Sequence, residues 1–402
     1  MNMSRKDSIS LDLIGISGTY KGGASIFART FLTEFISNTD TEVKVVLPKK
    51  ERSHYSDLGA SKENITFHYF EQRDNFIIRI IFGLGTRIFR NRFMLAKVQQ
   101  YRWAEVIKFI EENSNVCLSL STYISFPLRN VRHYCTLHDI QEKALPHFFS
   151  YLEKSIRKTN VLNTLHNVTG LQVSSKFVKD EIIKYFPRES AEIDFRVIPE
   201  GYSSIELNST KYSNVERDET IRIILPANFW PHKGHETLFK ALELLNKEFQ
   251  LEVFCTGSIM GKSKEIAERL NVFNLTNVKF TGYLTREALI DLYKSSHIVL
   301  SCSMYESSSL PILEGAVLGC VPIASDIPPH IEMAQNLEMR LFKLGDFLDL
   351  HRTISSVINE IRLKSSTIQV LNSEKVLALS WNALMPNYLE FLLSEFAIQE
   401  RK

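Results

Sequence analysis

The sequence predicts an α/β protein built from two doubly wound parallel sheets. Apolar runs of strand length alternate with helical patterns through both halves of the chain, as successive βαβ units do. With 402 residues, the chain also exceeds what one hydrophobic core usually holds. A polar stretch at 203–220 separates the two series of strands and is predicted to be a linker. We therefore expect domains at 1–204 and 205–375, followed by a C-terminal helix at 376–402 that packs back on the first domain.

The expected strands are short runs rich in β-branched and aromatic residues. In the first half they lie at 11–16, 43–47, 65–70, 116–120, 133–137 and 170–173. In the second half they lie at 221–225, 251–255, 278–280, 298–300, 321–324 and 340–342. Ligands of open parallel sheets bind outside the carboxyl ends of the strands. The residues that follow these strands are therefore the candidates for a functional site.

The net charge of +2 conceals a difference between the two halves. Residues 1–204 carry 28 Lys and Arg against 22 Asp and Glu, whereas residues 205–402 carry 20 against 24. The basic first half favours an anionic partner there. A nucleic-acid partner is not expected.

The five cysteines form no Cys-x-x-Cys pair and their number is odd, which predicts reduced thiols and a cytoplasmic setting. No signal peptide is expected, because Asp12 interrupts the apolar run at 9–16. No uncharged apolar stretch approaches the ~20 residues that a transmembrane helix needs. We expect a soluble or peripheral protein.

Glu306 and Glu314 are the most informative residues of the chain, with seven residues between them. They lie between the expected strands at 298–300 and 321–324, and therefore at the carboxyl edge of a sheet. A carboxylate there can accept hydrogen bonds from two neighbouring hydroxyls, such as those of a ribose. Alternatively, Glu306 caps a turn and Glu314 faces solvent in the first turn of a helix, where the helix dipole favours negative charge.

Lys233 follows the first expected strand of the second half. An ammonium at that edge can be the counter-charge of a phosphate in an anionic leaving group. The neighbouring His232 and His235 have no Cys or carboxylate partner at metal-ligand spacing, so hydrogen bonding or packing is the expected role. No Asp-x-Asp sequence occurs, which disfavours a metal-held diphosphate. No metal and no cofactor are predicted.

A glycine-containing turn at 15–24 follows the first expected strand of the chain and precedes a helix. Gly22 and Gly23 would let backbone amides approach a phosphate at that helix N-terminus. A tight turn that needs positive φ would also explain the glycines. The spacing is not Gly-x-Gly-x-x-Gly, which disfavours a dinucleotide.

His138 follows the expected strand at 133–137, again at a sheet edge. A histidine there can bind a sugar hydroxyl or assist proton transfer, or it can be a structural side chain with satisfied hydrogen bonds.

The segment 73–102 carries seven basic residues and one acidic residue, interleaved with apolar side chains. This pattern is compatible with an element that rests on an anionic membrane face. A core helix with a solvated basic face would give the same pattern.

Together these motifs resemble the GT-B glycosyltransferases, specifically the retaining family 4, which includes bacterial mannosyl- and rhamnosyltransferases of polysaccharide assembly. The resemblance covers almost the whole chain. It rests on the segments 22–23, 136–139, 173–177, 197–201, 229–235, 280–284, 306–314 and 380–381. It implies two Rossmann-like domains that face a central cleft, with the acceptor bound by the first domain and the donor by the second.

The resemblance also implies a role for each matching residue. Glu314 would bind the nucleotide ribose, Glu306 would lie against the donor sugar, and Lys233 would neutralise the donor diphosphate. His138 would reach the hydroxyls of the donor sugar. The implied catalytic residues are therefore His138, Lys233 and Glu306. The implied donor-binding residues are Gly22, Gly23, Asn228, Lys233, Ser308, Ser309, Leu310 and Glu314.

Two departures from the family pattern concern the donor site. Family members usually carry Gly-Phe-Gly after the first glutamate, where this chain has three serines at 307–309, so the amides that hold the donor sugar are expected to be placed differently. Asn228 stands where an arginine is common. That change leaves diphosphate stabilisation resting more heavily on Lys233.

We therefore expect a retaining, metal-independent hexosyltransferase of O-antigen or capsule-type polysaccharide synthesis. Its donor would be a GDP-, UDP- or dTDP-linked sugar, and its acceptor a glycan or a lipid-linked oligosaccharide at the inner membrane face. Three alternatives remain open: a nucleotide-sugar-binding protein of the same fold without activity, a nucleotide-sugar epimerase, and an NAD-dependent oxidoreductase that uses the glycine turn.

Overall fold

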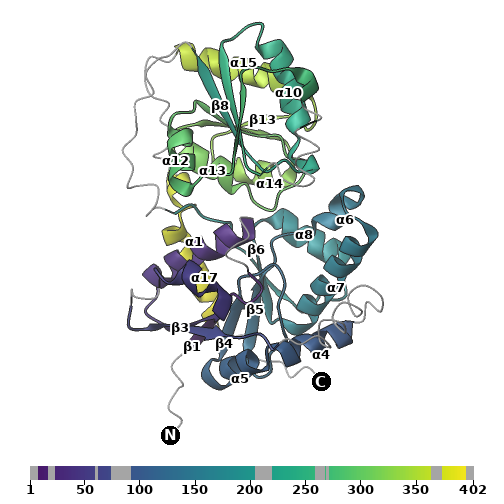
Figure 1. The fold of residues 1–402 in the computed structure, drawn as a ribbon, viewed down its shortest axis with the longest axis vertical. Helices are drawn as coiled ribbons and strands as arrows, with labels where there is room; N and C mark the ends of the chain where they lie inside the picture. The colour runs from purple at the N-terminus through teal and green to yellow at the C-terminus, as the bar shows by residue number, and fades with distance from the viewer. Residues whose placement is uncertain are drawn as a thin grey trace. The chain divides into compact units, whose positions relative to one another are not determined.

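The chain forms two compact units, and each is built on one parallel sheet (Figure 1). The first unit comprises Met1–Pro199 with Leu384–Lys402, and the second comprises Glu200–Ala383. The computed structural model describes residues 8–16, 23–58, 62–73, 92–203, 220–258, 268, 271–363 and 374–394. The expected linker therefore lies almost wholly outside the described residues, as do Gly22 and most of the basic segment at 73–102.

The first unit has a seven-stranded sheet with the order β3-β2-β1-β4-β5-β6-β7. Its strands are β1 (Ser8–Asp12), β2 (Glu42–Pro48), β3 (Ile65–Phe70), β4 (Val116–Ser119), β5 (Arg132–Thr136), β6 (Gly170–Val173) and β7 (Asp194–Val197). Its helices are α1 (Gly23–Asn38), α2 (Arg52–Tyr55), α4 (Arg92–Arg102), α5 (Ala104–Asn113), α6 (Gln141–Ala144), α7 (Tyr151–Asn167) and α8 (Lys176–Tyr185). Two short 3-10 turns lie at Lys49–Glu51 and Pro146–Phe148.

The second unit has a six-stranded sheet with the order β10-β9-β8-β11-β12-β13. Its strands are β8 (Ile221–Pro226), β9 (Leu251–Thr256), β10 (Val278–Gly282), β11 (Ile298–Ser301), β12 (Val321–Ser325) and β13 (Arg340–Phe342). Its helices are α10 (His235–Leu245), α12 (Arg286–Lys294), α13 (Leu310–Val317), α14 (Pro328–Met333), α15 (Phe347–Leu363) and α16 (Glu374–Leu377). Two 3-10 turns lie at Pro231–Lys233 and Asn271–Phe273. In both sheets the strand order reverses next to the first strand, as in doubly wound folds.

The second sheet is covered on both faces by helices (Figure 1). Ile223 and Leu225 of β8 pack in one cluster with α10 and α15. Ile224, between them, packs in the opposite cluster with α12 and α13. Because successive side chains of a strand point to opposite faces, a strand buried on both sides reads as a continuous apolar run. This explains the apolar run at 223–225 in β8.

The last helix, α17 (Trp381–Leu393), packs on the first unit through aromatic side chains. The ring of Tyr388 lies 4.8 Å from that of Phe31 in α1, and the ring of Phe391 lies 4.6 Å from that of Tyr134 in β5. These buried contacts attach the C-terminal segment to the first sheet.

All twelve strands expected from the sequence are present, and one further strand, β7, was not expected. The first strand required correction, because it spans Ser8–Asp12 and not 11–16. Asp12 is the last residue of the strand. Its carboxylate accepts the backbone N–H of Ile14 at 2.8 Å, which gives that N–H a partner where the strand ends. All five cysteines are buried, and none forms a disulfide.

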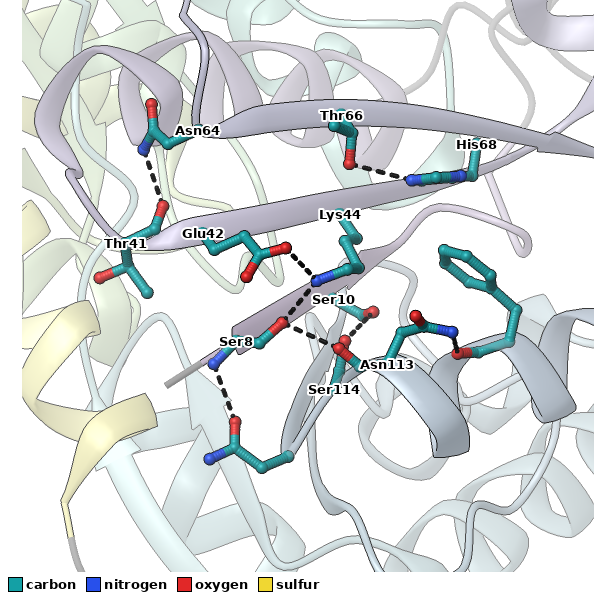
Figure 2. Close-up of polar contacts among 12 residues, drawn as sticks. Ser8, Ser10, Thr41, Glu42, Lys44, Asn64, Thr66, His68, Asn113 and Ser114 are labelled. Atoms are coloured by element: carbon teal, nitrogen blue, oxygen red, sulfur yellow. Dashed lines mark hydrogen bonds and ion pairs between the residues drawn. The ribbon is translucent and has the colours of Figure 1, made fainter. Parts of the chain in front are cut away.

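Polar contacts at the amino ends of the first sheet are structural (Figure 2). Lys44 Nζ donates to Ser8 Oγ at 2.8 Å and to Glu42 Oε1 at 2.6 Å. The hydroxyls of Ser10 and Ser114 lie 2.8 Å apart. These contacts tie β1, β2 and the end of α5 together at the edge opposite to the one where a ligand is expected.

Asp12 belongs to a buried hydrogen-bonded chain that crosses the first sheet. Ser119 Oγ donates to Asp12 Oδ2 at 2.8 Å and lies 2.9 Å from His133 Nε2. Burial raises the pKa of Asp12 to about 6, although the hydrogen bonds from Ile14 and Ser119 oppose the shift. Burial also lowers the pKa of His133 to about 3. Asp12 is therefore ionised at neutral pH inside a core that disfavours its charge.

Replacing Asp12 with Asn is expected to stabilise the protein at pH 7.5 by up to about 3 kcal/mol. Asn keeps the acceptor for Ile14 and can donate to Ser119, but it carries no buried charge. The native pKa of Asp12 lies above its unfolded value, so the wild type gains stability as the pH falls. The difference in the free energy of unfolding between the variant and the wild type should therefore be about 1.4 kcal/mol smaller at pH 5 than at pH 7.5.

Urea unfolding at the two pH values measures this difference. Asp40→Asn is the matched control, because the Asp40 side chain is fully exposed and should leave the unfolding midpoint unchanged. A gain in stability from Asp12→Asn that is equal at both pH values would contradict the assignment of a buried charge.

Candidate functional site

The loops after β8 and β11 meet at the carboxyl edge of the second sheet, where its strand order reverses. The backbone N–H of Met304 donates to the carbonyl of His232 at 2.7 Å. Gly234 has a φ of +66°, and a Cβ added there would lie 2.1 Å from the carbonyl oxygen of Cys302. The loops therefore touch backbone to backbone. This is the crevice in which open α/β sheets bind ligands.

Lys233 and Glu306 meet in this crevice. Lys233 Nζ donates to Glu306 Oε1 at 2.6 Å, and the two side chains are 20% and 16% exposed. Burial raises the pKa of Glu306, but the Lys233 ammonium and hydrogen bonds from Lys233 and Ser303 outweigh burial and hold the pKa below its usual value. Glu306 is therefore ionised at neutral pH. It occupies one of the three N–H donors of the ammonium.

Ser309 and His330 hold the loop that follows Glu306. His330 Nδ1 donates to the carbonyl of Ser325 at 2.7 Å, so its Nε2 accepts from the hydroxyl of Ser309 at 2.6 Å. Burial lowers the pKa of His330, against the opposing charge of Glu306, which keeps the ring neutral. The Ser309 hydroxyl is thus directed at His330, and it does not cap α13. Ser309 therefore anchors the loop to the start of α14.

Glu314 lies in α13 and is 6% exposed. Both of its carboxylate oxygens bind Arg286, the first residue of α12. Arg286 Nη1 donates to Oε2 at 3.0 Å, and Nη2 donates to Oε1 at 2.6 Å. The expected alternative, a Glu314 that faces solvent, is wrong.

The remaining donor-binding candidates of the second unit lie around the same edge. The side-chain oxygen of Asn228 accepts the backbone N–H of Ser258 at 2.7 Å, which ties the loop after β8 to the end of β9. Ser308 is half-buried in the loop between β11 and α13. Leu310 is the first residue of α13 and packs against the core on that side of the sheet.

The candidates of the first unit lie at the carboxyl edge of the first sheet. His138 follows β5, is buried, and packs edge-on against the Phe27 ring of α1 at 4.8 Å. Gly23 is the first residue of α1 and is exposed, whereas Gly22 lies outside the described residues. His138 and α1 are therefore neighbours. The sequence order of the strands does not by itself reveal this contact.

Sequence reasoning missed Arg286, His330 and Ser303. Arg286 had a usable signal, because a cation in the first turn of a helix opposes the helix dipole. The residues around His330 do not mark it as part of the site. Its partner Ser309 was considered only for donor binding, so the contact between the two was not expected.

His232 and His235 do not belong to a metal-binding cluster. No group of three His, Cys, Asp or Glu side chains suited to a metal ion occurs in the described ranges.

The chain is similar in sequence to known glycosyltransferases. Residues 209–369 match the family described as "Glycosyl transferases group 1". The chain is 25% identical over 278 residues to the serotype-specific mannosyltransferase WbdA of Escherichia coli, a match that covers 63% of this chain and 32% of the relative. The chain thus spans about a third of that relative's length.

Solved structures match almost the whole chain at low sequence identity. Sucrose-phosphate synthase from Thermosynechococcus elongatus has a TM-score of 0.69 and 18% identity, over 96% of this chain and 98% of the other. Anabaena HepE in complex with UDP and glucose has a TM-score of 0.66 and 18% identity, over 97% of this chain and 100% of the other. The two parallel-sheet units have the GT-B architecture of these structures, and the match to the glycosyl transferases group 1 family lies within the second unit.

Proposed function

We propose that the protein is a retaining, metal-independent glycosyltransferase of family 4. It transfers a hexose from a nucleotide sugar to a glycan or lipid-linked oligosaccharide in cell-surface polysaccharide synthesis, in the cytoplasm and in peripheral contact with the inner membrane. WbdA is named a mannosyltransferase, and HepE binds UDP and glucose, which supports a hexose carried on a nucleoside diphosphate.

The Lys233–Glu306 pair carries the proposal. It lies at the reversal point of the second sheet, inside the matched domain, and its cation is largely shielded from water. A cation held in such a place stabilises the charge that develops on a departing diphosphate more strongly than one in water. Glu306 fixes the ammonium and, in the proposal, lies against the donor sugar without forming a covalent bond to it.

Glu314 binds the ribose of the donor in this proposal, and the backbone at 308–310 contacts its phosphates. Ser309 and His330 keep that backbone in place. Asn228 acts by fixing the loop that carries Lys233. In the same proposal, His138 contacts the hydroxyls of the donor sugar, and Gly23 at the start of α1 lies near the phosphates and the acceptor. Water is excluded during transfer, which favours transfer over hydrolysis.

A thermal-shift panel of UDP, GDP, dTDP and ADP tests the proposal, because a ligand of the folded state raises the melting temperature by mass action. The stabilising nucleotide is then offered as its sugar conjugates in transfer assays. Glu314→Gln should weaken binding of that nucleotide about 10-fold or more, since hydroxyls bond more weakly to a neutral amide than to a carboxylate.

Glu360→Gln is the control, because Glu360 also pairs with an arginine, Arg340, at 3.0 Å, but at a more exposed position. It should leave nucleotide affinity unchanged. A protein that binds none of the four nucleotides would contradict the proposed function. Binding without transfer or hydrolysis would support a binding protein without activity instead.

A further inference from the structure

The loop between β5 and α7 is attached to α7 by one arginine. Arg157 lies in the second turn of that helix, and its guanidinium binds two carboxylates of the loop, those of Asp139 and Glu142. Asp139 directly follows His138 in the chain. We propose that Arg157 is a positioning residue that holds His138 in the orientation in which it acts. This role rests on the proposed contact of His138 with the donor sugar.

The contacts of Arg157 fix both the position and the angle of the loop. Its Nε donates to Glu142 Oε2 at 2.7 Å, and its Nη2 donates to Asp139 Oδ1. Its Cζ also lies over the ring of Phe149, at the end of the loop, 5.3 Å from the ring centre. Because a guanidinium is planar and its N–H directions are fixed, two carboxylates bound to it are held at a set angle to each other. Three residues of one loop are thus arranged around one rigid group.

His138 is held from both sides along the chain. On one side, the backbone N–H of Leu137 donates to the carbonyl of Gln172 in β6 at 3.0 Å. On the other side, Asp139 Oδ1 binds the guanidinium and also accepts the backbone N–H of Gln141 at 3.2 Å. The imidazole itself packs edge-on against an aromatic ring of α1 at 4.8 Å. The sheet and the arginine therefore fix the two residues that flank His138.

The burial of Glu142 explains why the loop cannot keep its position without the guanidinium. The Glu142 side chain is 1% exposed, whereas those of Asp139 and Arg157 are 32% and 26% exposed. A buried carboxylate that loses its cation is strongly destabilised, so the loop has to shift toward water. That shift displaces Asp139 and the adjoining His138. A displacement of about 1 Å at a reacting centre can lower the rate by about 10²-fold.

A double-mutant cycle between Arg157 and His138 tests this role. Arg157→Gln should lower kcat for transfer by about 10- to 100-fold. Calorimetry with UDP, GDP, dTDP and ADP should show an unchanged nucleotide affinity, because Lys233 and Glu314 belong to the second unit. In a His138→Ala background, the same substitution should lower kcat further by less than about 2-fold. An arginine that only stabilised the fold would give equal losses in both backgrounds.

Arg196→Gln is the matched control, because Arg196 also lies beside a largely buried carboxylate of the first unit, that of Asp194, at 3.8 Å. Its kcat should remain that of the wild type. If Arg157→Gln does not fold, Arg157→Gln combined with Glu142→Gln takes its place in the cycle. The combined variant leaves no buried carboxylate without its cation, but it still removes the guanidinium that orients the loop.

Equal losses of kcat in the two backgrounds would overturn the inference and leave the proposed function standing. An Arg157→Gln variant with wild-type kcat would do the same. A His138→Ala variant with wild-type kcat would overturn the inference together with the role proposed for His138. A wild type that transfers no sugar from any of the nucleotide sugars would overturn both the proposed function and the inference.

Discussion

Lys233→Ala is expected to lower kcat by about 10²- to 10³-fold, the usual effect of removing one preorganised group that stabilises developing charge. The diphosphate would leave without the cation, and the neutral side chain of Asn228 offers no replacement charge. The substitution also strands the ionised Glu306 in a largely buried position, at 16% exposure. Steady-state transfer kinetics, read with an unfolding curve of the same variant, measure both effects.

Two companion variants separate catalysis from stability. Lys233→Ala combined with Glu306→Gln removes the stranded charge, so its stability should recover while its turnover stays low. Lys240→Ala removes a lysine whose distance to its carboxylate partner, Glu236, is similar at 2.8 Å. Lys240 lies on the exposed surface of α10. It should change neither turnover nor the unfolding midpoint noticeably. Near-normal kcat for Lys233→Ala would refute the assignment of Lys233 to the leaving group.

Gly234→Ala is expected to destabilise the second unit by more than about 3 kcal/mol and to abolish nucleotide binding. The residue adopts a left-handed conformation, which costs an alanine about 1–2 kcal/mol. The new Cβ would also lie 2.1 Å from the backbone oxygen of Cys302, so the loops after β8 and β11 would have to separate. Lys233 and Glu306 would then lose their contact.

Gly282→Ala isolates the conformational part of this effect. Gly282 has a φ of +69°, almost that of Gly234, but no atom lies within 4 Å of the position where its Cβ would be. The variant should therefore lose only about 1–2 kcal/mol and keep its site. Urea unfolding and thermal shift with the bound nucleotide measure the comparison. Equal losses in the two variants would show that the backbone contact between the loops is not what holds the site together.

The central strands of this protein could be predicted because they are buried on both faces. β11 begins with the apolar run at 298–300, and β8 contains the apolar run at 223–225 after Arg222. β7 was missed because its four residues, Asp194–Val197, are only partly buried or exposed and show no such run. β1 was predicted at 11–16, which includes Asp12, but it begins at Ser8 and ends at Asp12. The Asp12 carboxylate accepts hydrogen bonds from Ile14 and Ser119.

The candidate site could be predicted only as separate segments. Lys233, Glu306 and Glu314 each follow a recognisable strand, so their common edge is implied by the sequence. The contacts that these residues make are not implied by the sequence. The ion pair of Lys233 with Glu306 spans 73 residues of chain, and no local pattern specifies it. Ser309 was expected to serve the donor, and only its distance to His330 shows that its hydroxyl is engaged by a histidine of α14.

Two parallel α/β units and the edge at which a charged ligand would bind can be predicted from the residues in order, because burial periodicity and strand-to-helix turns are local properties of the chain. Which charge neutralises which is known only from the folded protein. Glu306 is paired with Lys233, and Glu314 is held by Arg286. A carboxylate removed from water is stabilised strongly by a neighbouring cation, and which cation reaches it depends on how distant loops are brought together.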